Sequence, residues 1–440
     1  MSSTDSKTGV VSFEEARRIV ESHAAEVRAA RGGSSATEIV EVLAARGRVL
    51  AEEILADRDF PPFHRATRDG YAVRAADVER VPAQLEAIGE IKAGHSAEAC
   101  AVKSGQCVSI MTGAALPPGA DAVVMVEYTM ASGNSVEIQN SVRSGENFVP
   151  RGAEARAGQV LVQKGRRLDH ALIAIAASVG KSRIAVFCKP RVAVLSTGDE
   201  VVDIDMSPGA AEIRNSNSYS LAAQVEEAGG EAVRIEIAPD EPKRLRELIE
   251  RGFECDLLLI TGGVSMGKYD LVEQVLGEMK AEFYFTGARI QPGKPVVFGA
   301  CSADGPACES AAPGDKTRAR ATAPHIPARR YFFGLPGNPV STMVTFRLFA
   351  QPMIAALAGA RPEPLTFLKA RLKAEVRTKT GLTRFLPAVI SGELENAEVE
   401  LAAWQGSGDI AALARANCYL VVPPDREQIK AGEWVSVLLP

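Results

Sequence analysis

The sequence lacks the paired cysteine and histidine patterns that mark a zinc site or a disulfide framework. Its seven cysteines are scattered without a C-x-x-C pair, and its five histidines show no H-E-x-x-H spacing. An odd number of dispersed thiols is typical of a protein from a reducing compartment. We therefore expect the histidines to be structural or surface residues rather than metal ligands.

Long apolar runs and a strong charge of one sign are also missing. The most apolar stretch, residues 171–180, is far shorter than the roughly 20 residues that span a bilayer, and residues 1–9 are too polar for a secretory signal. With 50 basic against 55 acidic residues, the net charge of −5 argues against sequence-independent nucleic-acid binding. These features predict a soluble cytoplasmic protein that needs neither a membrane nor nucleic acid.

The 440 residues suffice for roughly three domains at about 150 residues each. Residues 12–30 have helical spacing, and we expect a second helix to follow them. Between residues 82 and 165, Gly and Pro separate short Val- and Ile-rich segments, which predicts small β modules. These segments are residues 107–111, 122–126 and 135–138.

Residues 190–355 alternate between strand-like and helix-like segments, which predicts a parallel sheet covered by helices. The expected strands are 191–195, 232–237 and 256–260, and the expected helices are 220–228 and 243–251. After residue 362 the pattern returns to alternating strands and predicts a compact β domain. Residues 301–327 carry almost no large apolar side chains, so we expect a mobile insertion between neighbouring strands at 296–298 and 331–333.

Three glycine-rich turns follow predicted strands, at residues 196–200, 261–265 and 334–341. Ligands of parallel sheets bind outside these strand ends. In the third turn, Asn338 is a natural N-cap and Pro339 a natural first helical residue, so the helix would direct unpaired N–H groups at an anion. The turns favour a phosphate-bearing ligand, and the alternative is that their glycines serve only tight strand-to-helix packing.

Several carboxylates lie close to these turns in the sequence. Beside a phosphate they would repel the ligand unless a hard cation intervened, and Mg²⁺ is the cation that carboxylates and phosphates share. Asp240 has an alternative role as a helix N-cap, since Pro242 follows it. Lys294, on a loop stiffened by two prolines, suits an oxyanion or is a solvated surface residue. The carboxylates are Asp199, Glu200, Asp240 and Asp270.

Two further segments are ambiguous from spacing alone. Asp69 precedes Gly70, which permits a tight turn, and the segment reads as a surface turn. Thr112 offers a hydroxyl at an expected strand-to-loop transition.

Six ordered motifs together resemble the MoeA family of molybdopterin molybdenumtransferases, which includes the E domain of gephyrin. The resemblance runs from about residue 12 to the end, apart from the insertion. The motifs are Arg-Asp-Gly-Tyr-Ala (68–72), Ile-Met-Thr-Gly-Ala (110–114), Ser-Thr-Gly-Asp-Glu (196–200), Thr-Gly-Gly-Val-Ser-Met-Gly (261–267), Pro-Gly-Lys-Pro (292–295) and Gly-Leu-Pro-Gly-Asn-Pro-Val-Ser (334–341).

The resemblance implies a multidomain α/β plus β fold. Its centre is a three-layer α/β MogA-like ligand-binding domain, joined by small mixed and β-rich domains and a C-terminal β-barrel-like domain. The expected boundaries are 10–57 with 153–187 for a discontinuous linking and dimerisation domain I, 58–152 for β-rich domain II, 188–355 for α/β domain III with the insertion 301–327, and 356–440 for β domain IV.

The implied reaction inserts molybdate into the dithiolene of adenylylated molybdopterin and releases AMP with the help of Mg²⁺. The resemblance also implies a homodimer with shared active sites, in which Asp69 and Thr112 reach the site from the other subunit and Asp240 and Asp270 hold Mg²⁺. A molybdopterin adenylyltransferase and molybdenum apo-enzymes are the expected partners. The catalytic positions carried over are Asp69, Thr112, Glu200, Asp240 and Asp270. The substrate-binding positions are Thr197, Gly198, Asp199, Gly262, Gly263, Ser265, Lys294, Pro295, Pro336, Gly337, Asn338, Pro339, Ser341 and Ser407.

The chain departs from the family pattern on the molybdate side. Arg68 stands where Met is usual, Gln291 where many members have Lys, and Pro387 where others have Arg; Glu154 replaces an Asp of some members. The pocket thus loses one cation, which Arg289 or Arg68 would restore. Two other readings remain open: a molybdopterin adenylyltransferase, which shares two of the turns but normally lacks the flanking domains, and a non-catalytic pterin-binding scaffold.

Overall fold

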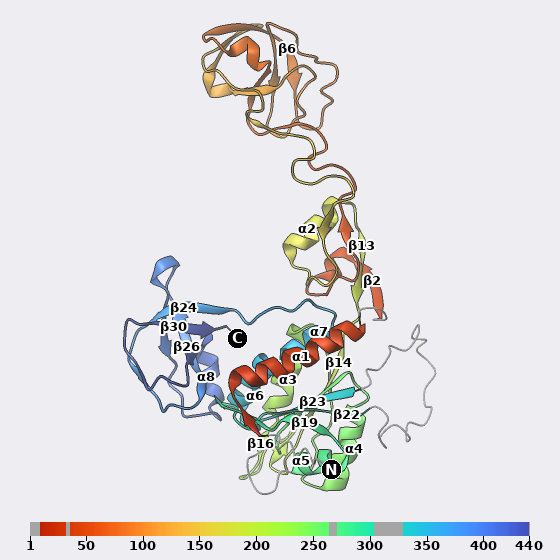
Figure 1. Cartoon of the computed structure of the whole chain (residues 1–440), viewed down its shortest axis with the longest axis vertical. Coiled ribbons are helices and arrows are strands. Elements are labelled where there is room, and N and C mark those ends of the chain that lie inside the picture. Colours follow the sequence, from red (N-terminus) through yellow and green to blue (C-terminus); the bar gives the residue numbers. More distant parts are fainter. Residues whose placement is uncertain (1–8, 32–35, 264–270, 303–328, 440) are drawn as a thin grey trace, which may run out of the picture.

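The computed structural model describes residues 9–31, 36–263, 271–302 and 329–439, and these form an elongated molecule (Figure 1). A six-stranded β module that contains β6 lies at one end, a small module with α2 lies in the middle, and a helix-covered sheet lies at the other end beside the C-terminal β domain. The predicted domain boundaries stay a prediction.

The N-terminal helix α1 (Phe13–Arg31) confirms the expected helix. Its apolar stripe of Ala16, Val20, Ala24 and Val27 is buried in the core of the α/β body. The second helix expected after it is wrong. Strand β2 (Thr37–Glu41) and a single 3₁₀ turn, η1 (Val42–Ala45), follow instead, because β-branched residues favour extended backbone and β13 (Arg183–Phe187) supplies a pairing partner.

The middle module joins two distant stretches of sequence around one core. Strand β3 (Ile54–Leu55) pairs with β12 (Val160–Val162), and the apolar stretch near residue 171 forms α2 (His170–Ser178). Asp169 caps this helix by accepting a hydrogen bond from the Leu172 N–H at 2.8 Å. Leu50, Ile54, Leu172 and Val186 share the buried core, so residues on both sides of the β module fold together.

The β module confirms the small β segments expected between residues 82 and 165. Its strand order is β8-β5-β7-β6-β10-β9. The bounds are β5 (Gly70–Val73), β6 (Ala83–Ile91), β7 (Gln106–Ile110), β8 (Ala122–Met125), β9 (Thr129–Ser132) and β10 (Ser135–Ile138), with 3₁₀ turns η2 (Ala75–Val78) and η3 (Val126–Tyr128). Nearby, β4 (Arg65–Ala66) pairs with β11 (Phe148–Val149).

The sheet of the α/β body has the order β17-β14-β18-β23-β22-β19. The expected parallel arrangement holds for the first four strands, whereas β22 and β19 run antiparallel to their neighbours. Each of these two pairs with a strand close to it in sequence, and antiparallel pairing needs no crossover helix. The bounds are β14 (Arg191–Ser196), β17 (Glu231–Arg234), β18 (Leu257–Thr261), β19 (Glu282–Phe285), β22 (Val297–Ser302) and β23 (Arg329–Leu335).

Helices cover both faces of this sheet, which gives the three-layer architecture that the resemblance implies. One core combines Val194 and Leu259 with α1, α3, α6 and α7, and the other combines Leu195 and Ile260 with α4 and α5. Successive residues of one strand thus point into different cores, as expected for a strand that is buried on both faces of the sheet. The helices are α3 (Ser216–Glu227), α4 (Pro242–Gly252), α5 (Leu271–Glu278), α6 (Pro339–Thr345), the π-helical turn η5 (Phe346–Ala350) and α7 (Gln351–Leu357).

The continuous helical stretch Pro339–Leu357 is, among the described residues, the one long and apolar enough to cross a membrane. Since 72% of its most apolar window is buried inside the molecule, packing against the sheet accounts for its composition.

The C-terminal strands close into a five-stranded barrel, which confirms the barrel-like expectation. The order is β26-β27-β24-β30-β28, and pairing of β28 with β26 completes the circle. The bounds are β24 (Phe367–Leu372), β26 (Thr383–Ser391), β27 (Glu398–Leu401), β28 (Cys418–Val422) and β30 (Trp434–Leu438), with α8 (Ile410–Arg415) and the 3₁₀ turn η6 (Leu394–Asn396).

Short pairings complete the fold and tie the barrel to the α/β body. Strand β21 (Ile290–Gln291) of the body pairs with β26 of the barrel. The remaining pairs are β1 (Val10–Val11) with β20 (Gly287–Ala288), β15 (Val201–Val202) with β16 (Ile213–Arg214), and β25 (Val376–Arg377) with β29 (Gln428–Ile429).

The predicted insertion needs one correction at its start. Cys301 and Ser302 belong to β22, where they pair with Arg330 and Arg329 of β23, and the Cys301 side chain is buried. The neighbouring strands expected on either side of the insertion are confirmed, since Phe298 lies opposite Phe333. Residues 303–328 lie outside the described part of the chain.

Candidate active site

The three glycine-rich turns meet at one cavity, as their positions after strands predict. Strands β14, β18 and β23 are neighbours in the sheet, and the turns follow their carboxyl ends around a cavity of about 370 Å³. Nine of the predicted site residues line it: Thr197, Glu200, Gly262, Gly263, Pro295, Pro336, Gly337, Asn338 and Pro339.

Glycine is required where the first two turns touch. Gly262 has a φ of +91°, and a Cβ there would lie 2.5 Å from the carbonyl oxygen of Thr197. Gly262 is thus packed tightly against the first turn rather than against a helix, and this contact brings the first and second turns to the same cavity.

Two buried polar atoms at the cavity have no hydrogen-bond partner among the described residues. They are Thr197 Oγ1 and Asn217 Oδ1. Asn217 is held in place because its Nδ2 donates to the carbonyl oxygen of Gly337 at 2.7 Å and to Thr261 Oγ1 at 3.0 Å. An unsatisfied buried polar group costs about 1–3 kcal/mol, so a ligand that pairs with both atoms would remove a penalty built into the site.

Sequence reasoning missed the contribution of α3 to this cavity. Asn215 and Asn217 line it, and Asn215 caps the helix because its Oδ1 accepts from the Ser218 N–H at 3.1 Å and from Ser196 Oγ at 3.0 Å. The prediction started the helix at Ser220, whereas it begins at Ser216. The Asn-Ser-Asn-Ser run at 215–218 is an N-cap signal that would have placed the start correctly.

Asn338 stands at the N-cap position of α6, as predicted, but its side chain does not cap the helix. Its Nδ2 donates instead to Ser407 Oγ at 3.0 Å, and the Val340 N–H donates to the Ser407 carbonyl oxygen at 3.1 Å. The predicted Ser407 thus lies beside the third turn. Ser341 is buried in α6 and does not line the cavity.

Asp240 lies next to the first turn, and its backbone N–H donates to Asp199 Oδ1 at 3.0 Å. The N-cap of α4 is Glu241, with no side-chain capping bond, so the alternative N-cap role of Asp240 is wrong. Burial, followed by the charges of Asp199 and Glu200, raises the pKa of Asp240. The three carboxylates therefore repel one another in the absence of a cation.

This donor set fits Mg²⁺ in its chemistry. Carboxylate oxygens are the protein ligands that Mg²⁺ prefers, and the ion takes one or two of them plus ligand phosphates. Within the described ranges, no group of three Asp, Glu, His or Cys side chains is arranged to hold a metal on its own. Asp270 and Ser265 lie outside the described residues.

Asp69 and Thr112 come together, although within one chain they do not reach the cavity. Asp69 Oδ1 accepts from the Thr112 N–H at 2.6 Å and from Thr112 Oγ1 at 2.8 Å, and these bonds lower the pKa of Asp69. Both residues are exposed on the β module, which Figure 1 shows at the opposite end of the molecule from β14.

Three other predicted residues are neighbours in sequence of residues that line the cavity but do not line it themselves. The half-buried Lys294 adjoins Pro295, which lines the cavity, while Gly198, Asp199 and Lys294 do not line it. Of the departures from the family pattern, Arg68, Gln291 and Glu154 are exposed and Pro387 is buried in β26 of the barrel. Arg289, which would restore the lost cation, is exposed as well.

Sequence profiles of three regions match nearly the whole chain. They are the MoeA N-terminal region (domain I and II) over residues 11–180, the "Probable molybdopterin binding domain" over residues 193–356, and the MoeA C-terminal region (domain IV) over residues 369–439. The layered sheet with a ligand cavity at its strand ends defines the class of α/β ligand-binding proteins.

Similar proteins point the same way. A molybdopterin molybdenumtransferase of Nostoc sp. is 34% identical over 412 residues, which cover 91% of this chain and 88% of the relative. One from Staphylococcus epidermidis is 31% identical over 398 residues, covering 89% and 88%. The crystal structure of the molybdopterin biosynthesis MoeA protein of Pyrococcus horikoshii OT3 matches with a TM-score of 0.74 at 28% identity, covering 98% of this chain and all of that one. The chain belongs to the MoeA family of molybdopterin molybdenumtransferases.

Proposed function

We propose that the chain is a molybdopterin molybdenumtransferase of molybdenum cofactor biosynthesis, which inserts molybdate into the dithiolene of adenylylated molybdopterin and releases AMP. The observation that carries this proposal is the cavity at the ends of β14, β18 and β23, with its unpaired Thr197 Oγ1 and Asn217 Oδ1, in a chain of this family.

The chain's own groups suit such a substrate. Asn217 Oδ1 offers a fixed acceptor for a ligand N–H, and Thr197 Oγ1 offers a hydroxyl that can donate to a phosphate oxygen. The first two turns approach each other closely at Gly262, so their backbone comes within reach of an extended ligand. Lys294 supplies a positive charge near Pro295 for an oxyanion.

Mg²⁺ would be held by Asp240 and Asp270 together with the phosphoanhydride oxygens, and would offset the negative charge that develops when this anhydride is cleaved. Cleavage adds one water across the P–O–P bond and yields AMP and the phosphate of molybdopterin. The raised pKa of Asp240, caused by burial and by Asp199 and Glu200, supports a cation at this position.

The proposal also includes a homodimer, in which Asp69 and Thr112 of the partner subunit complete each site. Two observations support it: the pair is exposed, and it lies far from the cavity of its own chain. An upstream adenylyltransferase would deliver the substrate, and molybdenum apo-enzymes would receive the product. The buried free thiols of Cys107, Cys301 and Cys418 suit a cytoplasmic location.

The deciding experiment supplies purified protein with adenylylated molybdopterin, with and without molybdate and Mg²⁺, and measures AMP and pterin-bound molybdenum. We expect both products to appear together and only when molybdate and Mg²⁺ are present. Tight binding without AMP or molybdenum transfer would instead indicate a scaffold. Adenylylation of free molybdopterin with ATP would indicate the adenylyltransferase, which is not favoured because the family match extends over residues 11–180 and 369–439.

A further inference from the structure

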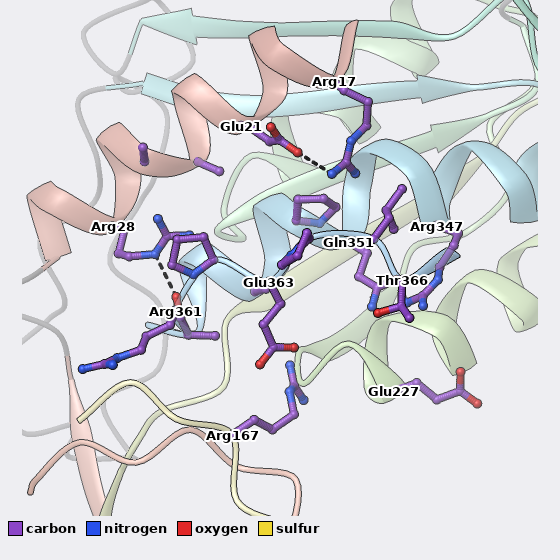
Figure 2. Close-up of a pocket in the computed structure, with 18 residues that line it drawn as sticks. Arg17, Glu21, Arg28, Arg167, Glu227, Arg347, Gln351, Arg361, Glu363 and Thr366 are labelled. Atoms are coloured by element: carbon purple, nitrogen blue, oxygen red, sulfur yellow. Dashed lines mark hydrogen bonds and ion pairs between the residues drawn. The ribbon is translucent and has the colours of Figure 1, made fainter. Parts of the chain in front are cut away.

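A second cavity, of about 570 Å³, lies where α1 meets α7 and the segment 360–366 that leads to the barrel (Figure 2). It shares no lining residue with the predicted active site. Arg167, from the segment before α2, and Glu227, at the end of α3, complete its wall. The cavity therefore lies at the junction of the middle module, the α/β body and the segment that leads to the barrel.

The lining is rich in arginine. Five arginines and three glutamates face this cavity, which leaves a surplus of two positive charges. Figure 2 shows Arg17 and Arg347 at one side, Arg28 and Arg361 at the other, and Arg167 below them. The charged lining residues are Arg17, Arg28, Arg167, Arg347, Arg361, Glu21, Glu227 and Glu363.

Two of the arginines are already held by the protein. Arg17 donates to the carbonyl oxygen of Leu348 at 2.7 Å and pairs with Glu21, and Arg167 donates to the carbonyl oxygens of Gly47 and Ala228. These bonds fix the walls of the cavity and tie the middle module to the α/β body.

Within the described part of the chain, the other three arginines keep N–H donors that are free for another acceptor. Arg28 and Arg361 donate through Nε to the carbonyl oxygens of Ala360 and Lys164, at 2.8 and 3.1 Å, and these bonds occupy none of their Nη donors. Arg347 donates from Nη1 to Gln351, while its buried Nε has no hydrogen-bond partner among the described residues. A buried unpaired donor on a cation is costly.

Burial has an electrostatic consequence as well. It lowers the pKa of Arg17, Arg28, Arg167 and Arg347, and for each of them it is the largest effect. The cations have lost hydration that the nearby carboxylates do not fully replace. An anion in the cavity would supply the missing interaction.

We propose that this junction cavity is a second ligand site that binds a phosphate group, carried by a small organic ester or as the free ion. A phosphate monoester carries about −1.5 to −2 charges at pH 7, which matches the surplus of two positive charges. Guanidinium groups bind phosphate oxygens in a bidentate geometry. Ala24, Pro352, Ala355 and Leu365 give the cavity apolar walls for an organic part, and its volume lies within the range of small-molecule sites.

The test titrates the full-length protein with inorganic phosphate and with ribose 5-phosphate by calorimetry at constant ionic strength. The double variant Arg28→Gln/Arg361→Gln should weaken binding at least tenfold. The matched control Arg183→Gln removes an exposed arginine that pairs with Glu41 and does not line the cavity, and should bind as the wild type does. Lys294→Gln, which removes the cation proposed for an oxyanion at the predicted active site, should also keep this binding.

Each outcome decides the proposal. Unchanged binding in the double variant, loss of binding in Lys294→Gln alone, or no binding of either probe at 20 mM would overturn it. Tighter binding of ribose 5-phosphate than of phosphate would indicate an organic ester as ligand, and equal affinities would indicate the free ion.

Because Arg361 is exposed, the double variant is expected to fold, and a melting temperature within a few degrees of wild type checks this. Arg347→Lys provides a second variant that keeps the charge but removes the unpaired Nε. Transferase activity is measured separately, so failure of the proposed function leaves this binding test intact.

Discussion

The carboxylate of Asp69 accepts two hydrogen bonds from Thr112, one from its backbone N–H at 2.6 Å and one from its hydroxyl at 2.8 Å, across 43 residues of sequence. The pair joins the start of β5 to the end of β7. It orients one carboxylate on an exposed face, far from the cavity formed by the same chain. Such a pair is useful for catalysis only if another molecule brings a cavity to it.

This relationship predicts complementation between two inactive variants. Asp69→Ala and Asp240→Ala should each lose at least 90% of AMP release. If Asp69 acts on the partner's site, a hybrid dimer of the two variants has one site with both defects and one intact site, and AMP release should return to about half the wild-type rate. Co-expression with two affinity tags followed by the assay on purified hybrids measures this.

The control for complementation uses two defects on the same module. In a hybrid of Asp69→Ala with Thr112→Ala, each site receives one damaged module, so activity should stay low. Restoration in this control, or none in the hybrid of Asp69→Ala with Asp240→Ala, would contradict a site shared between subunits.

Thr197 predicts a trade-off between stability and binding. Thr197→Val removes a buried hydroxyl that has no partner among the described residues, so the free energy of unfolding of the ligand-free protein should stay constant or rise by about 1 kcal/mol. Binding of adenylylated molybdopterin should weaken about tenfold, because the ligand loses its hydrogen bond to the Thr197 hydroxyl. Urea unfolding and titration calorimetry measure the two quantities.

Thr345→Val is the matched control for Thr197→Val. The Thr345 hydroxyl is buried and donates to the Ser341 carbonyl oxygen at 2.8 Å, so its removal should destabilise the fold by about 1 kcal/mol and leave ligand affinity unchanged. A loss of stability in Thr197→Val as large as in this control would mean that the Thr197 hydroxyl is structural.

Asp240 predicts a pH dependence with a defined sign. Its folded-state pKa is raised above the ordinary value of 3.8, so the native state binds more protons than the unfolded state, and stability falls as pH rises through and above 3.8. Asp240→Asn should therefore be more stable than the wild type at pH 7, and this advantage should shrink as pH falls towards 4. Denaturant unfolding from pH 4 to pH 7 in the presence of a chelator measures it.

Added Mg²⁺ should reduce the advantage of Asp240→Asn at pH 7, because the cation offsets the repulsion from Asp199 and Glu200 only where a carboxylate is present. Asp425→Asn, at an exposed position in the C-terminal region, should show no Mg²⁺ effect. A pH-independent difference between Asp240→Asn and the wild type would refute the electrostatic explanation.

Much of this site followed from local sequence signals. The glycine-rich turns after strands placed Thr197, Gly262 and Gly337 at one cavity, because parallel strands end at the same edge. The roles of Asp69 and Thr112 were implied only by the family resemblance, and their contact was not predicted, since no local pattern links residues 43 positions apart. Asn217 was missed because its role depends on Gly337, a partner 120 positions away.

The fold was predictable where the hydrophobic periodicity is strong, as in α1 and α4. It was less predictable where a pairing strand, distant in sequence, determines the secondary structure of a segment. The segment 37–41 became a strand because β13 lies beside it. The antiparallel direction of β22 likewise results from its pairing with β23, the next strand along the chain. The spacing of apolar residues does not reveal strand direction.

The ends of β22 and β23 lead to a last prediction about the segment between them. Ser302 lies directly opposite Arg329 in the antiparallel ladder, so a two-residue Asn-Gly link can replace residues 303–328 in a type I′ turn. The shortened protein should melt within a few degrees of the wild type and release AMP at a rate within twofold, because the paired residues are all retained. A second deletion that also removes Cys301 and Ser302 takes away buried ladder residues and should lower the melting temperature clearly. Calorimetry of both proteins compares them, and a large loss of stability or activity in the first one would show that residues 303–328 are needed for the fold or the reaction.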